Sequence, residues 1–195
     1  MKITSAEFIK STFQPQDYPP DSLPEVAFAG KSNVGKSSLI NTLVNRKKLA
    51  HTSSTPGRTQ SINFFRINQK ITFVDLPGYG FAKVPLAIKR QWKPMVETYL
   101  QSRKNLYLVV VILDCRRESS SDDISLLEWL KFHNIPLAVV LTKIDKVSYN
   151  QKTKQKALIK KSFSLEESQI VLFSAVSGEG KEELWKKILS HVSMR

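Results

Sequence analysis

The stretch Gly30-Lys31-Ser32-Asn33-Val34-Gly35-Lys36-Ser37 decides how this chain is expected to fold. It has phosphate-loop spacing, in which a glycine and four further residues precede Gly-Lys-Ser. An apolar run lies before it at residues 25–29, and a helical apolar stripe follows it over residues 39–44. The glycines let backbone N–H groups turn toward phosphate oxygens, the lysine adds positive charge, and the serine hydroxyl can bind Mg²⁺. The stretch therefore predicts a nucleoside triphosphate site between a strand and a helix.

The length and composition suit one α/β domain that works inside the cell. The chain has 195 residues, of which 41% are hydrophobic and 24% are charged, an ordinary balance for a globular protein. Because it shows no signal-peptide pattern and no apolar run of about 18 residues, we expect a cytoplasmic protein without membrane contact. Cys115 is the single cysteine, and no histidine has metal-ligand spacing with it, which argues against a disulfide, a catalytic thiol and a cysteine–histidine metal centre.

The charge balance is strongly basic. Lys and Arg number 30 against 17 Asp and Glu, a formal charge of +13, which favours association with a polyanion such as nucleic acid. A basic surface that serves only solubility is the alternative. The basic residues cluster at Arg46-Lys47-Lys48, at Arg116-Arg117, and on a segment with Lys152, Lys154, Lys156, Lys160 and Lys161.

The remaining chain alternates strand-like and helix-like segments. Apolar runs predict strands at residues 25–29, 62–67, 71–74, 106–113, 135–141 and 170–173. The run at 106–113 is nearly continuous, as expected of a central parallel strand that is buried on both faces. Asn68-Gln69 predicts a hairpin turn, Pro85 a helix start, and Ser120 with Asp123 a capping box.

The two ends of the chain carry weaker signals. Residues 1–24 are expected to form an extension packed on a domain that spans residues 25–195, because an apolar start is followed by four prolines. Trp129 and Trp185 fall within helical apolar patterns, so we expect both in the core rather than as base-stacking residues.

A second polar motif, Asp75-Leu76-Pro77-Gly78, directly follows the strand at 71–74. An acid at the carboxyl end of a strand faces the ligand crevice in such sheets. In a triphosphate site Asp75 can hold Mg²⁺ through water, and the Gly78 backbone can approach the terminal phosphate. An ordinary turn is the alternative for this pattern in isolation, and its place after a phosphate loop favours the nucleotide role.

Two further motifs end strands in the second half of the chain. They are Thr142-Lys143-Ile144-Asp145 and Ser174-Ala175-Val176. A carboxylate can accept hydrogen bonds from the ring N–H and the amine of guanine, a lysine stem can lie over the purine, and a backbone N–H near Ala175 can donate to O6. Adenine presents the opposite pattern, so the pair predicts a guanine pocket. Separately, the two motifs could be a surface ion pair and a turn.

In this order the motifs resemble those of P-loop GTPases. Gly30 to Ser37, Thr-Pro-Gly-Arg-Thr-Gln at residues 55–60 and Asp-Leu-Pro-Gly-Tyr-Gly-Phe-Ala at residues 75–82 are most similar to the EngB (YihA) family of bacterial ribosome-assembly GTPases, in the class of TrmE, Era, EngA and septins. The resemblance spans most of the chain. It implies a G domain with a mostly parallel six-stranded sheet and helices on both faces, Mg²⁺-dependent GTP hydrolysis, and a role in large ribosomal subunit maturation linked to cell division and septation.

The resemblance also implies roles for single residues. Ser37 and Thr59 would be the protein ligands of Mg²⁺, with Thr55 as the alternative to Thr59. A switch segment, Gly57-Arg58-Thr59-Gln60-Ser61, would close over the γ-phosphate. Lys36, Thr59 and Gly78 would help to position phosphate and water. By the same resemblance, the residues that would contact the nucleotide are Gly30 to Ser37, Gly57 to Ser61, Asp75 to Gly78, Thr142 to Asp145 and Ser174 to Val176.

Two positions depart from the commonest GTPase pattern. Thr142 stands where many GTPases have asparagine, and Tyr79 stands where the best-known small GTPases have a glutamine that positions water. The catalytic residue is therefore unassigned, and slow hydrolysis is expected, because a phenol is a poor substitute for a carboxamide. Related GTPases with asparagine at the position of Asn33 use it to help hold a monovalent cation, which makes K⁺ a candidate cofactor; the alternative is that Asn33 only shapes the loop.

The expected partner is the large ribosomal subunit or its precursor, through ribosomal RNA and protein, with the chain acting as a monomer. The basic clusters favour RNA contact. The alternative is a GTP-dependent switch for a protein partner in cell-cycle control without RNA contact. A third interpretation, a phosphate-loop ATPase, explains the first motif but assigns no role to Thr142 to Asp145 or to Ser174-Ala175.

Overall fold

The structure is a computed structural model that describes residues 1–50, 61–79 and 86–193, and within this range it omits the side chains of 86–92. At its centre lies β2 (Glu25–Gly30), which is buried along its whole length and leads into the phosphate loop. On either side of it run β4 (Ile71–Asp75) and β5 (Leu106–Asp114), both parallel to β2. The predicted phosphate loop therefore starts from the middle of the sheet, where neighbouring strands end at the same edge.

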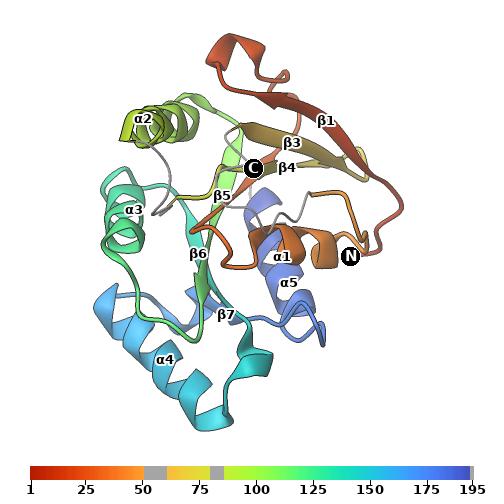
Figure 1. The fold of residues 1–195 in the computed structure, drawn as a ribbon. Helices are drawn as coiled ribbons and strands as arrows, with labels where there is room; N and C mark the ends of the chain where they lie inside the picture. Colours follow the sequence, from red (N-terminus) through yellow and green to blue (C-terminus); the bar gives the residue numbers. More distant parts are fainter. Residues whose placement is uncertain (51–60, 80–85, 194–195) are drawn as a thin grey trace.

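The sheet has seven strands among the described residues, in the order β1-β3-β4-β2-β5-β6-β7. On one side β5 is followed by parallel β6 (Leu137–Thr142) and β7 (Ile170–Leu172). On the other side β3 (Ile62–Ile67) pairs antiparallel with β4 through the predicted hairpin turn, in which Asn68 and Gln69 have positive φ. Figure 1 shows the sheet nearly edge-on.

The seventh strand was not expected. β1 (Ala6–Thr12) lies within the N-terminal extension and pairs antiparallel with β3 at the sheet edge. An edge strand has only one strand neighbour, so most residues of β1 are exposed or half-buried, and Phe8 is 54% exposed. The apolar pattern of this segment is correspondingly weak. A short 3₁₀ turn (Pro15–Asp17) follows, and then the chain leads into β2.

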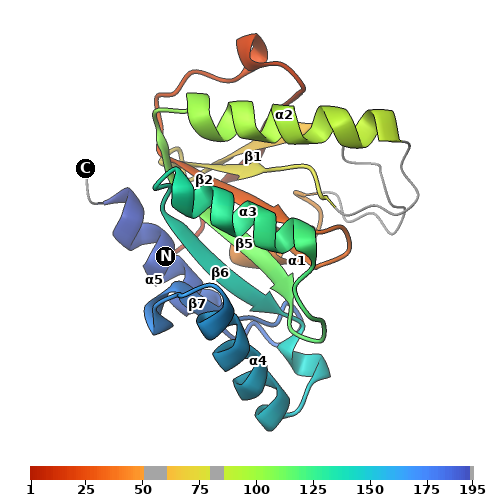
Figure 2. The same ribbon diagram turned by 90° about the vertical axis from the view of Figure 1, so that its left-hand side faces the viewer.

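Helices cover both faces of the sheet, as the resemblance implies. One face carries α1 (Lys36–Leu43) and α5 (Lys181–Val192). The other carries α2 (Leu86–Ser102), α3 (Ser121–Phe132) and α4 (Tyr149–Ser162), which lie in front of the sheet in Figure 2. Two more 3₁₀ turns, Ile144–Lys146 and Glu167–Gln169, flank α4. No helix in the described parts of the chain is long and apolar enough to cross a bilayer.

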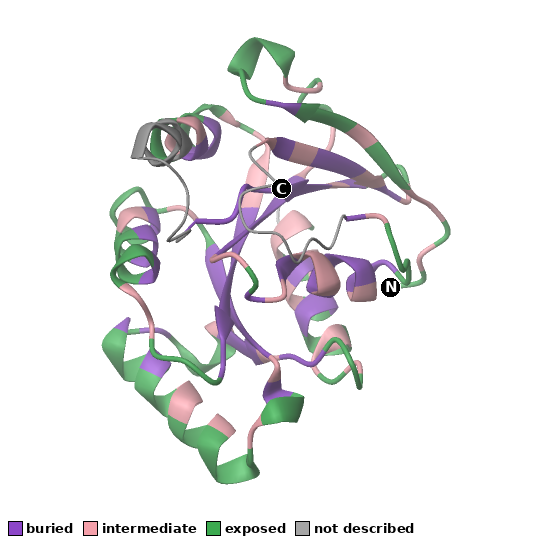
Figure 3. Ribbon diagram, in the orientation of Figure 1, coloured by how far each residue is buried: buried purple, intermediate pink, exposed green. Residues whose placement is uncertain are grey.

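The core has two halves, one on each side of the sheet, and the central strands β2, β5 and β6 between them are almost continuously buried (Figure 3). Trp185 is 3% exposed, stacks on Phe73 and donates its ring N–H to the Leu43 carbonyl at 3.0 Å. Trp129 is partly buried against the other half. The predicted packing role is confirmed for Trp185, while Trp129 lies at the core margin beside His133, with 4.2 Å between ring centres.

Candidate functional site

The phosphate loop bends sharply from β2 into α1. Gly35 is the N-cap of α1 and has φ of +103°, a backbone conformation that residues with a side chain rarely adopt. Asn33 also has positive φ, at +63°. The turn aims the N-terminus of α1, with its free N–H groups, at the carboxyl edge of the sheet. This geometry suits an anion such as a phosphate group.

Lys36 and Asp75 form a buried ion pair at this edge. The Lys36 Nζ donates to Asp75 Oδ1, and the two side chains are only 9% and 5% exposed. Asp75 reaches this place because β4 runs parallel to β2 and pairs Asp75 with Phe28. The structure thus brings one charged residue from each of the first two motifs together.

The Asp75–Gly78 motif also contacts the phosphate loop through its backbone. The N–H of Ser32 donates to the Tyr79 carbonyl at 3.0 Å. A Cβ atom at Gly78 would lie 2.9 Å from Ser32 Oγ, a distance that real Cβ atoms essentially never show. A side chain at position 78 would therefore force the Ser32 hydroxyl to move, while the Ser32 backbone nitrogen would still lie 3.4 Å away.

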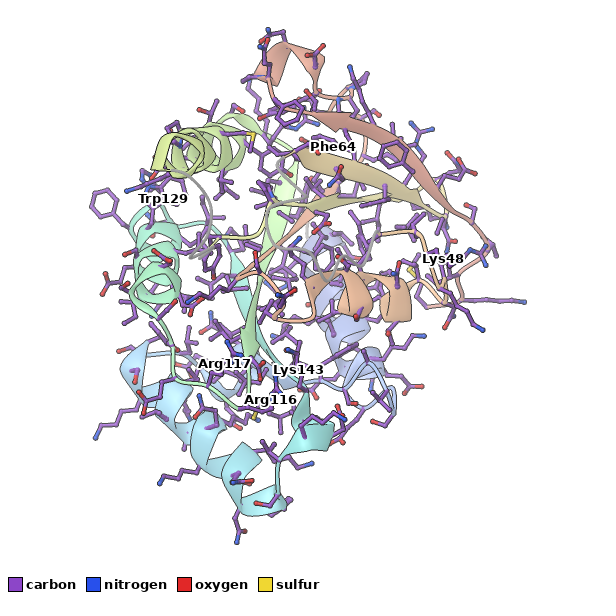
Figure 4. The ribbon with its side chains drawn as sticks, in the orientation of Figure 1. Lys48, Phe64, Arg116, Arg117, Trp129 and Lys143 are labelled. Carbon is purple, nitrogen blue, oxygen red and sulfur yellow. The ribbon has the colours of Figure 1, made fainter. Side chains whose placement is uncertain are left out.

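Lys143 lies across the outer side of the phosphate loop. Its Nζ donates to the Asn33 carbonyl at 2.6 Å and to Asp114 Oδ2 at 2.9 Å. Asp114 ends β5 and is also bound by the Arg116 guanidinium through two bonds of 2.9 and 2.8 Å. Figure 4 shows Lys143 and Arg116 gathered near this end of β5. Burial alone would raise the pKa of the Asp114 carboxyl, but the hydrogen bonds from Arg116 and Lys143 hold that pKa well below its usual range.

Asp145 and Ser174 join the two motifs expected to bind guanine. The Ser174 hydroxyl donates to Asp145 Oδ1 at 2.7 Å and accepts from the backbone N–H groups of Val176 and Ser177, each at 3.2 Å. Ser174 is fully buried, whereas Asp145 is exposed. The hydrogen bond from Ser174 is the main cause that lowers the pKa of Asp145, so this carboxylate is ionised and available as an acceptor at neutral pH.

Comparisons with known proteins agree with this geometry. A family model described as "50S ribosome-binding GTPase" matches residues 25–143, more than half of the chain. A probable GTP-binding protein EngB from Geobacter metallireducens is 59% identical over 188 residues, which cover 96% of this chain and 92% of that protein. Its counterpart from Geobacter sulfurreducens is 56% identical over 96% of this chain and 91% of its own length.

The chain belongs to the EngB family of P-loop GTPases.

Solved structures support the same assignment. A crystal structure of a probable GTP-binding protein EngB matches with a TM-score of 0.74 and 25% identity, over 88% of this chain and 100% of that one. A single-residue variant of Aquifex aeolicus Era bound to GDP·AlF₄⁻ matches with a TM-score of 0.70 and 30% identity, over 87% of this chain and 57% of that one. As an EngB-family GTPase, the protein binds GTP and hydrolyses it.

The first departure from the common GTPase pattern, Thr142, has a structural explanation. Its hydroxyl donates to the Val34 carbonyl at 2.6 Å and lies 3.1 Å from the Leu113 carbonyl oxygen. The side chain is 3% exposed and fastens the end of β6 to the phosphate loop. Threonine at this position therefore holds the scaffold of the site together.

The second departure, Tyr79, is also engaged within the protein. Its hydroxyl donates to Asp123 Oδ1 at 2.7 Å, and the side chain is 4% exposed. Asp123 belongs to the predicted capping box of α3, which is confirmed by reciprocal hydrogen bonds with Ser120. Burial first, and then the Asp123 carboxylate, raises the pKa of Tyr79 well above its ordinary value. The phenol therefore stays protonated and ties the Asp75–Gly78 motif to α3.

The sequence did not reveal the roles of two acids that organise the site. Asp114 binds Lys143, and Asp123 binds Tyr79. The signal for Asp114 was present, since it ends an apolar strand just as Asp75 does. Asp123 was predicted only as a helix cap, because nothing in the sequence links it to a residue 44 positions earlier.

Several predicted site residues lie outside the described part of the chain. They are Gly57, Arg58, Thr59 and Gln60, together with the alternative magnesium ligand Thr55. Ser61, the last residue of the predicted switch segment, is described and its hydroxyl bonds Asn63 Oδ1 at 3.2 Å. Leu76, Pro77 and Ile144 are buried, while Ala175 and Val176 are exposed beside Ser174.

Proposed function

We propose that this GTPase acts in assembly of the large ribosomal subunit. In this proposal the GTP-bound protein, a cytoplasmic monomer, docks on the subunit or its precursor, and hydrolysis releases it; a link to cell division would follow from the dependence of growth on ribosomes. The observation that carries the proposal is the match over residues 25–143 to a family described as binding the 50S ribosome. An Era structure that holds a fragment of 16S ribosomal RNA has the same fold, with a TM-score of 0.67 and 28% identity.

The experiment that tests this function is co-sedimentation with purified large ribosomal subunits. The protein should pellet with the subunits when a non-hydrolysable GTP analogue is bound and stay in the supernatant with GDP. Small subunits provide the control for non-specific adhesion of a protein with a charge of +13. Equal pelleting in both nucleotide states, or with both subunits, would overturn the proposal.

The alternative is a switch that binds a protein partner in cell-cycle control without touching RNA. One observation favours it: on α4 the lysines Lys152, Lys156 and Lys160 are engaged by Glu179 and Glu167, so that cluster offers less free positive charge than the sequence suggests. The salt dependence of binding separates the two functions, since protein contacts of this kind depend on salt less steeply than phosphate contacts.

The residues present fit a magnesium ion. Ser37 on the first turn of α1 and Asp75 at the end of β4 supply a hydroxyl and a carboxylate, the hard oxygen donors that Mg²⁺ prefers. Ser37 and Thr59 would hold the ion directly and Asp75 through water, with the phosphates completing its shell. When bound, Mg²⁺ neutralises charge on the phosphate oxygens. Lys36, Thr59 and Gly78 would position the terminal phosphate and the attacking water.

Hydrolysis without an activator should be slow, on the order of 10⁻⁴–10⁻² s⁻¹, because Tyr79 points to Asp123 and no glutamine stands in its place. A K⁺ ion is a second candidate cofactor. If Asn33 helped to hold it, the ion would add positive charge near the phosphates. The positive φ of Asn33 supports the other interpretation, that asparagine is there for its tolerance of this conformation. Replacing K⁺ by Na⁺ at fixed ionic strength should slow hydrolysis if K⁺ takes part, and an unchanged rate would remove K⁺ from the mechanism.

A further inference from the structure

One buried side chain, that of Asn41, holds the turn after α1 in place through hydrogen bonds. Asn41 is 6% exposed, and its amide donates to the Ala50 carbonyl and accepts from the Ala50 N–H, both at 2.8 Å. The N–H of Arg46 donates to the Asn41 carbonyl at 2.9 Å. Ala50 is fully buried, and Leu49 packs against the core half that contains α1 and α5. Because both ends of the turn are fixed, its backbone holds a defined shape.

This turn presents three cations to solvent. Arg46, Lys47 and Lys48 are exposed, and none of the ion pairs formed within the described residues includes them. Lys181 adds a fourth positive charge next to them, since its Nζ bonds the Asn45 side chain. Figure 4 shows Lys48 at the outer end of α1, away from the phosphate loop. We call Arg46, Lys47 and Lys48 the basic turn.

The lysine cluster on α4 differs in this respect. Lys152 pairs with Glu179 at 3.1 Å, and Lys156 and Lys160 share Glu167. These hydrogen bonds and charges from Lys156 and Lys160 lower the pKa of Glu167, so the carboxylate that neutralises them is ionised. A phosphate that bound these lysines would have to displace or face a carboxylate. The basic turn imposes no such cost.

We propose that the basic turn binds the phosphate backbone of RNA on the large ribosomal subunit. Arginine can grip a phosphate with two parallel hydrogen bonds, and lysine acts as a point charge, so the turn suits two or three successive phosphates. A pre-shaped turn loses less conformational freedom on binding than a flexible tail with the same charges. The inference rests on the proposed function and names the surface that carries it.

The position of the turn in the chain links it to the nucleotide. Thr55 and Thr59, the two residues considered as magnesium ligands, follow residue 48 by 7 and 11 positions. The turn therefore precedes, along the chain, the segment that is expected to respond to the γ-phosphate.

The test compares two variants with the same loss of charge. One carries Arg46→Gln, Lys47→Gln and Lys48→Gln, and the matched control carries Lys152→Gln, Lys156→Gln and Lys160→Gln. Binding to purified large subunits is measured with a non-hydrolysable GTP analogue between 50 and 200 mM salt. For two to three lost phosphate contacts, the affinity advantage of the native protein over the turn variant should shrink by roughly 10- to 40-fold across this range. The α4 control should keep the native salt slope.

The outcomes separate this inference from the proposed function. If the native protein binds large subunits in neither nucleotide state, the proposed function fails. If it binds with a steep salt slope that the turn variant retains, the basic turn is not the contact. A flat slope in the native protein would assign the docking to protein instead and overturn the inference alone. GDP affinity equal to native shows that a variant is folded, and the single change Lys47→Gln should still lower the slope by about 0.7–0.9.

Discussion

The phosphate end and the base end of the nucleotide site are built in different ways. At the phosphate end, the loop shape depends on Gly35, and the charged pair Lys36–Asp75 is almost completely buried. At the base end, Asp145 is exposed, and it is kept in place by a neighbour, Ser174. The phosphate end is therefore fixed by the loop backbone and by a buried ion pair. At the base end, the position of Asp145 depends on its hydrogen bond with the Ser174 side chain.

This difference predicts where substitutions act. A change at the phosphate end should disturb the free protein and its nucleotide affinity together, because the same buried groups serve both. A change of Asp145 at the base end should alter affinity or base preference with a smaller effect on folding, because Asp145 is nearer to solvent.

The largest effect is expected for Lys36→Ala. It leaves the Asp75 carboxylate buried without its cation, which should lower the free energy of unfolding of the nucleotide-free protein by about 3–5 kcal/mol. Urea unfolding measures this loss. The double variant Lys36→Met with Asp75→Asn should recover much of the stability without recovering GTP binding. Full stability in the single variant would show that the pair is not a structural element of the phosphate end.

A smaller effect is expected for Asp114→Asn, which changes a buried carboxylate that holds Lys143 of the base-end motif. The amide offers one acceptor oxygen where the carboxylate serves both Lys143 and Arg116, so GDP affinity should fall by about 1–2 kcal/mol, or roughly 5- to 30-fold. Titration calorimetry measures this loss of GDP affinity. Arg116→Gln should weaken GDP binding less, because Lys143 then keeps its hydrogen bond to the Asp114 carboxylate.

The same variant has a defined pH dependence. Because the pKa of Asp114 is depressed in the folded protein, its contribution to stability is fully present above the unfolded pKa and is lost as the pH falls through the folded pKa. The stability difference between the native protein and Asp114→Asn should therefore stay constant from pH 8 to about pH 4 and shrink only below it. A difference that disappeared near pH 6 would contradict the depressed pKa.

The smallest effect is expected for Tyr79→Phe, at the contact between the Asp75–Gly78 motif and α3. It removes only the hydroxyl that binds Asp123, which should cost about 1 kcal/mol of stability. Single-turnover GTP hydrolysis should change by less than about threefold, since a group that takes part in proton transfer would contribute on the order of 10²-fold or more. A loss of that larger size would make Tyr79 catalytic.

The described part of the phosphate end could be predicted from the sequence, apart from the ion pair between Lys36 and Asp75. Its parts follow one another along the chain as strand, loop and helix, and Asp75 directly ends the adjacent strand. Asp145 and Ser174 could be placed for the same reason, because each closely follows a parallel strand that ends at the same edge.

The remaining features could not be predicted, because they depend on which strands and helices are neighbours. Asp114 meets Lys143 only because β5 and β6 pair, and Tyr79 meets Asp123 only because α3 packs beside the second motif. A packed N-terminal extension was expected, but its pairing as β1 with β3 was not, because an edge strand needs little apolar pattern and the paired residues lie 50 to 61 positions apart.

Asp145 at the base end is expected to set the preference of the site for guanine. The measurement that tests it most directly is titration of GDP, ADP and xanthosine diphosphate onto the native protein and Asp145→Asn. The native protein should prefer GDP over ADP by on the order of 10⁴-fold. The variant should bind GDP about 2–4 kcal/mol more weakly and should prefer xanthosine diphosphate, whose extra carbonyl accepts from the new amide. Equal affinity of the native protein for GDP and ADP, or an unchanged preference in the variant, would contradict the account.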